Sequence, residues 1–167
     1  NGPMKVRKLE VHFPEFNKEE KLDDQLNTMV KLAKEPTLTA YAPYSLFKVG
    51  AAVRLTNGTI IKGSNQENIA YPSGLCAERV ALYAASSQFP DEEIESIAVT
   101  VDHQFPTEDE VFSPCGACRQ VMAEIELKSQ KKIQIIVHSP DGVTRVFDGI
   151  GQLLPFSFHN SGLKKLK

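Results

Sequence analysis

The sequence predicts an α/β fold in which helices cover a partly parallel sheet. Its apolar segments follow the order helix, two strands, helix, strand, helix, two strands and a short C-terminal piece. A succession of strand, helix, strand, helix and strand is typical of a sheet whose strands are joined by crossover helices. The 167 residues, 41% of them hydrophobic and 24% charged, suit one globular core. We therefore expect a single α/β domain.

The first helix is expected to begin at Asn17, a candidate N-cap that two acidic residues follow in the first turn. Apolar residues then recur at helical spacing, and Pro36 lies just beyond the end; they are Leu22, Leu26, Met29, Val30 and Ala33. Before this helix, alternation over residues 9–13 predicts a short half-buried strand. Residues 36–45, which include two prolines, are expected to form a loop.

Two pairs of strand-like segments are each separated by a turn signal that favours a hairpin. The turns are Asn57-Gly58 and Pro140-Asp141-Gly142, and the strands are residues 47–55, 59–63, 133–138 and 143–147. A fifth strand is expected at 94–101, followed by a polar, acidic loop over 104–113. Helices are expected over 75–87 and from Pro114 or Cys115 to about residue 127.

Composition excludes several classes of function. The formal net charge is −2 and the pI is about 6.1, so we expect no basic surface for nucleic acid or anionic membrane. No apolar run approaches the ~18 residues that span a bilayer, and the N-terminus lacks a signal-peptide core. Three cysteines without a secretory signal argue against a disulfide framework. The expected location is the cytoplasm.

The three cysteines all stand at the predicted starts of helices. Cys115 and Cys118 form a C-x-x-C pair, and Cys76 lies on an earlier helix. Helix N-termini favour anions and would stabilise the thiolates that bind metal. Three protein ligands with an open fourth position are typical of catalytic zinc, whereas structural sites are usually closed by four. By itself, however, a C-x-x-C is equally compatible with a redox pair or with two unrelated buried cysteines.

A glutamate two residues after Cys76 favours zinc chemistry. Residues 76–78 (Cys-Ala-Glu) and 114–118 (Pro-Cys-Gly-Ala-Cys) match the pattern of zinc nucleobase deaminases, in which a ligand, one residue and a glutamate precede a later Pro-Cys-x-x-Cys. Glu78 and the third thiolate would be superfluous in a thiol-redox protein or a non-enzymatic zinc-binding module. His138, in an apolar strand segment, is expected to be a core or interface histidine.

On these motifs the chain resembles the cytidine deaminases of nucleoside salvage, in their all-cysteine, homotetrameric zinc form. The matching blocks extend over roughly residues 40–158 and comprise residues 41–52, 64–72, 75–79, 113–120 and 153–155. The resemblance implies a three-layer α/β/α sandwich with a mixed five-stranded sheet. Residues 1–3 (Asn-Gly-Pro), which precede Met4, are expected to be a cloning remnant. The rest is expected to comprise an N-terminal extension with its packing helix (4–36) and the deaminase core (37–167).

The resemblance implies zinc-dependent hydrolysis of cytidine and deoxycytidine to uridine, deoxyuridine and ammonia. Cys76, Cys115 and Cys118 would bind one Zn²⁺ per chain, whose water would become a hydroxide nucleophile. Glu78 would take the water proton, deliver it to the ring nitrogen and protonate the leaving amine. Arg79 would hydrogen-bond the zinc-bound sulfurs and offset their charge.

The resemblance also implies a set of substrate contacts within the chain. Asn65 and Glu67 would hold the ribose hydroxyl, and a carboxylate there would repel a 5′-phosphate. Phe47 would pack against the base, and the backbone of Ala77 would contact the pyrimidine. A related aminopyrimidine nucleoside deaminase, such as a blasticidin-S deaminase, remains the alternative substrate class.

In the homotetramer that the resemblance implies, neighbouring chains complete each site. Tyr71 would reach an adjacent subunit's site, and Phe158 would stack on the base from another chain. Phe156 competes with Phe158 for this role, and a dimer is the alternative assembly. The expected partners are therefore a nucleoside and further copies of the chain, with neither nucleic acid nor membrane.

Overall fold

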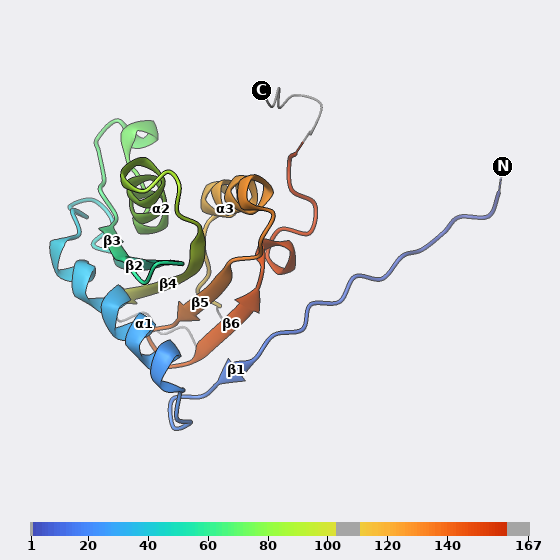
Figure 1. The fold of residues 1–167 in the computed structure, drawn as a ribbon, viewed down its shortest axis with the longest axis horizontal. Helices are drawn as coiled ribbons and strands as arrows, with labels where there is room; N and C mark the ends of the chain where they lie inside the picture. The colour runs from blue at the N-terminus through green and yellow to red at the C-terminus, as the bar shows by residue number, and fades with distance from the viewer. Residues whose placement is uncertain (1, 103–110, 160–167) are drawn as a thin grey trace.

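The computed structural model describes residues 2–102 and 111–159, which form three layers (Figure 1). Helix α1 (Asp24–Lys34) covers one face of a sheet, while α2 (Ala77–Gln88) and α3 (Gly116–Ser129) cover the other. The predicted α/β fold is confirmed. The loop expected over 104–113 lies largely outside the described residues. Among the residues that the structure describes, no helix has both the length and the apolar composition that a membrane-spanning segment requires.

The sheet has six strands within the described residues, in the order β1-β6-β5-β4-β2-β3. Their bounds are β1 (Glu15–Phe16), β2 (Lys48–Leu55), β3 (Ile60–Ser64), β4 (Ile94–Asp102), β5 (Gln134–His138) and β6 (Thr144–Asp148). Strands β4 and β5 pair in parallel and the other neighbours pair antiparallel, so the sheet is mixed as expected. The expected count of five strands was one short, because β1 adds a strand at the edge.

The strand expected over residues 9–13 was wrong in position. Glu15 and Phe16 instead pair with β6, and the carbonyl of Pro14 accepts a hydrogen bond from Val146 at 3.0 Å. Residues 9–13 have alternating side chains but no strand partner, and Figure 1 shows the chain running from here away from the body. A side-chain pattern specifies which face is apolar, whereas a strand also needs backbone partners.

The helix start expected at Asn17 was also wrong. Asn17 Oδ1 accepts hydrogen bonds from the amides of Glu19 and Glu20 at 2.9 and 3.0 Å, and the Glu20 carboxylate accepts one from the Asn17 amide at 2.8 Å. This reciprocal capping pattern closes a turn without starting a helix. Helix α1 begins after Asp23, whose carboxylate caps the amide of Leu26 at 2.8 Å. Its buried face holds Leu26, Met29, Val30 and Ala33.

Alternate side chains of the central strands fill two separate cores, as the pleat of a sheet requires. The core beneath α1 contains the strand residues Ala52, Ala98, Ile136 and Val146. The core beneath α2 and α3 contains Val49, Ala51, Val53, Ile97, Val99, Ile135, Val137 and Phe147. The sheet is therefore buried on both faces in its centre.

Close packing of β3 against α2 fixes where α2 begins. The β2–β3 hairpin turns at Gly58 with φ +86°, which confirms the hairpin predicted from Asn57-Gly58. Further along β3, a Cβ atom added to Gly63 would lie 2.6 Å from the Ala81 amide nitrogen and 2.7 Å from the Ala77 carbonyl oxygen. Glycine is needed here because no side chain fits between strand and helix.

The segment between α1 and β2 is more ordered than expected. Residues 36–45 were predicted as a loop, but a 3₁₀ helix (Glu35–Thr39) forms its first half. The remainder leads across the sheet edge, where Tyr41 and Gln66 form an isolated parallel bridge. This bridge holds residues 41–47 next to the segment that follows β3.

Candidate functional site

Two helices begin side by side at one edge of the sheet, and each is preceded by a cysteine (Figure 1). Strands β3 and β4 run in the same direction, so α2 and α3 start at the same edge. Cys76 is the N-cap of α2 and Cys115 the N-cap of α3, and neither side chain makes a capping hydrogen bond. An N-cap side chain usually binds the first free amides. These two thiols are instead available for another partner.

The sulfur atoms of the three cysteines converge. Cys76 Sγ lies 3.7 Å from Cys115 Sγ, Cys115 Sγ lies 3.4 Å from Cys118 Sγ, and all three lie within 4.8 Å of one another. A tetrahedral zinc ion with Zn–S bonds of about 2.3 Å would separate its sulfur ligands by about 3.8 Å. Thiolates are also soft ligands that favour zinc. The predicted ligand set therefore fits zinc in both chemistry and spacing.

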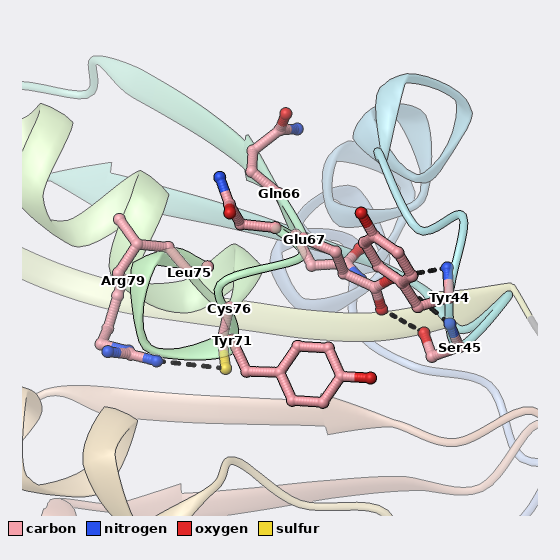
Figure 2. Close-up of a pocket in the computed structure, with 11 residues that line it drawn as sticks. Tyr44, Ser45, Gln66, Glu67, Tyr71, Leu75, Cys76 and Arg79 are labelled. Atoms are coloured by element: carbon pink, nitrogen blue, oxygen red, sulfur yellow. Dashed lines mark hydrogen bonds between the residues drawn. The ribbon is translucent and has the colours of Figure 1, made fainter.

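Arg79 and the crowding of the thiols set the charge of this cluster. Arg79 Nη2 donates a hydrogen bond to Cys76 Sγ at 3.5 Å, which Figure 2 shows. Hydrogen bonding with Cys118, opposed by burial and reinforced by the Arg79 guanidinium, lowers the pKa of Cys76 to about 5. The same contact with Cys76, together with burial, raises the pKa of Cys118. The Cys76 sulfur is therefore a thiolate at neutral pH.

Glu78 brings a buried carboxyl group to the cluster. It lies in the first turn of α2 and is 4% exposed. Burial, with a smaller contribution from the charge of Cys76, raises the pKa of Glu78 to about 7. The charge of Arg79 and the side chain of Cys118 oppose this increase in the pKa of Glu78. A carboxyl group that titrates near neutral pH can both accept and return a proton.

A cavity of about 500 Å³ opens beside Cys76 and Arg79 (Figure 2). Its volume is in the range typical of small-molecule sites. Residues 44–45, 65–68, 71 and 74–76 supply most of its wall. Figure 2 shows the ring of Tyr71 projecting past Cys76 towards Ser45. The cavity thus joins the thiol cluster to the loop that follows β3.

Asn65 lies in the wall of this cavity and supports the start of β2. Its Oδ1 accepts a hydrogen bond from the amide of Val49 at 2.9 Å, and its Nδ2 donates one to the carbonyl of Phe47 at 2.8 Å. The residue is buried. Its amide therefore holds the cavity wall in place.

Glu67 also lines the cavity, where its carboxylate organises the preceding loop. It accepts hydrogen bonds from the amides of Tyr44 and Ser45 at 3.0 and 3.3 Å and from the Ser45 hydroxyl. The hydroxyl contact lowers the pKa of Glu67, so this wall carries a negative charge. The sequence did not predict the roles of Tyr44 and Ser45. Both lie in an expected loop, and nothing in that segment indicated that Glu67 would be their hydrogen-bond partner.

Of the remaining predicted substrate residues, Tyr71 lies in the described cavity wall, whereas Phe47, Ala77 and Phe158 do not. Phe47 packs on Phe112, with ring centroids 6.2 Å apart, and Ala77 is buried at the start of α2. Tyr71 lines the cavity and is 76% exposed, with its ring edge-on to Tyr44. On the C-terminal segment, Phe156 and Phe158 are also exposed, and neither is part of the described cavity wall.

Comparisons with known proteins agree on one family. The sequence profile for the cytidine and deoxycytidylate deaminase zinc-binding region matches residues 23–134. A cytidine deaminase from Halalkalibacterium halodurans is 44% identical over 97 residues, which are 58% of this chain and 69% of that protein. One from Mycobacterium tuberculosis is 32% identical over 126 residues, 75% of this chain and 84% of that protein. The crystal structure of cytidine deaminase from Burkholderia pseudomallei has a TM-score of 0.67 and 36% identity, covering 79% of this chain and 98% of that one.

Proposed function

Because the chain belongs to the cytidine and deoxycytidylate deaminase family, we propose that it hydrolyses cytidine and deoxycytidine to uridine and deoxyuridine with release of ammonia. One observation carries this proposal: three thiols converge beside a cavity of about 500 Å³ that Cys76 lines, and the buried carboxyl group of Glu78 follows Cys76 by two residues in the first turn of α2. The named relatives are cytidine deaminases, so neither a blasticidin-type nor a thiol-redox function is favoured.

We propose that Cys76, Cys115 and Cys118 hold one zinc ion per chain. When bound, zinc lowers the pKa of a water molecule and supplies a hydroxide nucleophile at neutral pH. Three thiolates exceed the charge of one divalent cation, and the Arg79 guanidinium on Cys76 Sγ offsets part of that excess.

Glu78 is the proposed proton carrier. Its carboxylate oxygen would accept the proton that the attacking water loses and pass it to the ring nitrogen of the pyrimidine. It would then take the second proton of the same water from the newly attached hydroxyl group and deliver it to the amine as the C–N bond breaks and the carbonyl forms, so that water and cytidine give uridine and ammonia. The desolvated setting of Glu78, which brings its pKa to about 7, suits both directions of transfer.

The cavity wall supports a neutral nucleoside as substrate. Glu67 is ionised and its carboxylate lies among the lining residues together with Asn65. We propose that these two residues bind the ribose, with Phe47 and the backbone of Ala77 beside the base. A 5′-phosphate close to Glu67 would be repelled. Cytidine should therefore be turned over in preference to its monophosphate.

We further propose a homotetramer in which neighbouring chains complete each site. The supporting observation is that Tyr71 and Phe158 expose 76% and 77% of their surface although both are large and apolar. Metal-binding thiolates need a reducing compartment, so the proposed setting is pyrimidine salvage in the cytoplasm.

The activity test is incubation of the purified protein with cytidine, with the loss of its ultraviolet band and the release of ammonia followed together. Equal amounts of both changes, and about one zinc ion per chain, are expected. Metal-free protein with a reducible Cys115–Cys118 disulfide and no turnover would contradict the proposal.

Shared sites are tested by trans-complementation. Glu78→Gln chains are mixed with Phe158→Ala chains after dissociation and reassembled. If sites are shared, some sites in mixed oligomers combine an intact Glu78 with an intact Phe158, so activity exceeds the average of the parents. A fully active monomer in sedimentation, or no gain despite confirmed exchange, would defeat the proposed assembly.

A further inference from the structure

The C-terminal segment, residues 153–159, crosses the first turns of α3 outside any helix or strand. Arg119 fixes its beginning. The guanidinium donates hydrogen bonds to the Leu153 carbonyl at 2.7 Å, to the Pro114 carbonyl at 2.8 Å and to the Ser113 hydroxyl at 2.7 Å. One side chain thus ties the C-terminal segment to the turn that precedes Cys115.

Gln120, the next residue of α3, binds the far end of the same segment. Its Nε2 donates to the Phe158 carbonyl at 2.7 Å, and its Oε1 accepts from the Phe158 amide at 3.2 Å. The side-chain amide therefore satisfies both backbone groups of one residue, as a neighbouring strand would do. We call this contact the Gln120–Phe158 amide pair.

The amide pair orders the backbone of Phe158 while its ring stays free. Phe158 is 77% exposed, so packing of its side chain on its own chain does not account for its position. Phe156 is 88% exposed, and among the described residues no side chain makes a comparable pair with its backbone. The fold therefore distinguishes two aromatic residues that the sequence alone left as competitors.

We propose that Gln120 is a positioning residue for the nucleoside site: it holds the Phe158 backbone so that this ring, rather than that of Phe156, is presented to the substrate. The proposal rests on the proposed deaminase function and on the part given there to Phe158. Gln120 lies two residues beyond Cys118, so the amide pair also fixes the Phe158 backbone relative to the turn that carries two of the proposed metal-binding thiols.

A double-mutant cycle tests the proposal. Gln120→Met keeps the length of the side chain and removes both hydrogen bonds, and should raise the KM for cytidine about three- to tenfold. The kcat should change less than about twofold, because stacking on the base binds substrate and transition state alike. In a Phe158→Ala background, Gln120→Met should add nothing further to KM. Phe156→Ala should leave KM unchanged.

Gln152 supplies a matched control. Its amide also bridges two backbone groups, accepting from the Asp148 amide at 3.0 Å and donating to the His12 carbonyl at 2.8 Å. Gln152→Met should therefore lose equivalent bonds without changing KM. If Gln120→Met and Phe158→Ala raise KM additively, or if Gln152→Met has the same effect as Gln120→Met, the positioning role is overturned.

Hydrogen exchange at the Phe158 amide gives a readout that is independent of turnover. Exchange should accelerate in Gln120→Met and stay slow in Gln120→Glu, which keeps the acceptor oxygen for that amide. Unchanged exchange in Gln120→Met would overturn the amide pair itself. A wild-type chain that does not deaminate cytidine would instead refute the proposed function, while the exchange result still decides whether Gln120 orders Phe158.

Discussion

Buried polar groups have different roles on the two faces of the sheet. On the face beneath α1, polar groups pair with each other: His138 Nδ1 lies 2.9 Å from Thr144 Oγ1, and Thr100 donates to the His138 carbonyl at 3.0 Å. On the face beneath α2 and α3, Glu78 is buried against Cys118 and the sulfurs crowd together. The polar groups of His138, Thr144 and Thr100 are thus paired within the fold, whereas the second face gathers the thiols and the carboxyl group that the proposed zinc ion and substrate would use. Substitutions on the first should change stability, and those on the second should change chemistry.

The largest effect is expected from Glu78→Gln. The amide cannot carry protons, so kcat should fall about 10²–10⁴-fold, while zinc content and thermal stability are kept. Deamination rates and metal analysis on the same sample measure this. The control is Glu95→Gln. Glu95 lies on β4, away from the site, and forms an exposed ion pair with Arg54, so this variant also loses a carboxylate charge but should keep the wild-type rate. A near wild-type rate in Glu78→Gln would remove this residue from the mechanism.

Replacing any of the three cysteines by alanine should lower zinc content and stability together, because the proposed zinc ion would tie two helix starts together. For Cys118→Ala the loss is about 4 kcal/mol if free zinc stands 1,000-fold above its Kd. Melting temperatures with and without a chelator measure it: the chelator should destabilise the wild type and leave the variant unchanged. Ser129→Ala, at the other end of α3, is the control. Full zinc occupancy in a variant would show that its cysteine is no ligand.

Met29→Ala tests the opposite face. Met29 lies on the buried face of α1 and is 1% exposed. Its truncation should lower the free energy of unfolding by about 2–5 kcal/mol. Once the variant is folded, its kcat should equal that of the wild type. Denaturant titration and turnover at low temperature separate the two quantities. Lys31→Ala, exposed on the same helix, should change neither, and a fall in kcat of folded Met29→Ala would show that the faces are coupled.

The smallest effect is a pH dependence on the α1 face. Burial, assisted by the charge of Lys34 and opposed by Asp141, lowers the pKa of His138 to about 4 from its ordinary 6.5. The unfolded chain therefore binds a proton first as the pH falls, so the stability contributed by neutral His138 is present above pH 6.5 and lost towards pH 4. About 1–2 kcal/mol is expected, because the ring is partly exposed and solvent screens it.

Urea unfolding at several pH values measures this loss, and His138→Asn should flatten the profile over that range. His12→Asn is the control, since His12 is exposed on the N-terminal segment. If the free energy of unfolding varies with pH equally in wild type and His138→Asn, a group other than His138 causes the pH dependence.

Sequence patterns predicted those structural elements that depend on neighbouring residues alone. Asn57-Gly58 specifies a turn whatever surrounds it, and the turn forms as expected. Asn17 shows the limit of this reasoning: its capping hydrogen bonds form, yet the helix begins at Asp24. A cap favours a first turn, but a helix persists where its apolar face meets the sheet, and the buried face starts only at Leu26.

In the candidate site, too, local motifs predicted some residues, whereas contacts between distant segments were not predicted. Short motifs placed Cys76, Glu78 and the C-x-x-C pair at helix starts, and the fold brings those starts together. The hydrogen bonds from Ser45 to Glu67 and from Gln120 to Phe158 join residues 22 and 38 positions apart. Their geometry depends on how distant segments pack, so a pattern within one segment gave no indication of it.

Strand β1 has a consequence for how the protein behaves at high concentration. An uncovered outer strand offers a row of free backbone groups that can recruit another molecule's sheet. Here Glu15 and Phe16 occupy part of β6, the Glu15–Arg145 ion pair adds charge at 2.6 Å, and Pro14 accepts from β6 while having no N–H group of its own to offer. A chain shortened to begin after residue 16 would leave β6 open and would aggregate more readily. This short edge therefore contributes colloidal stability rather than chemistry.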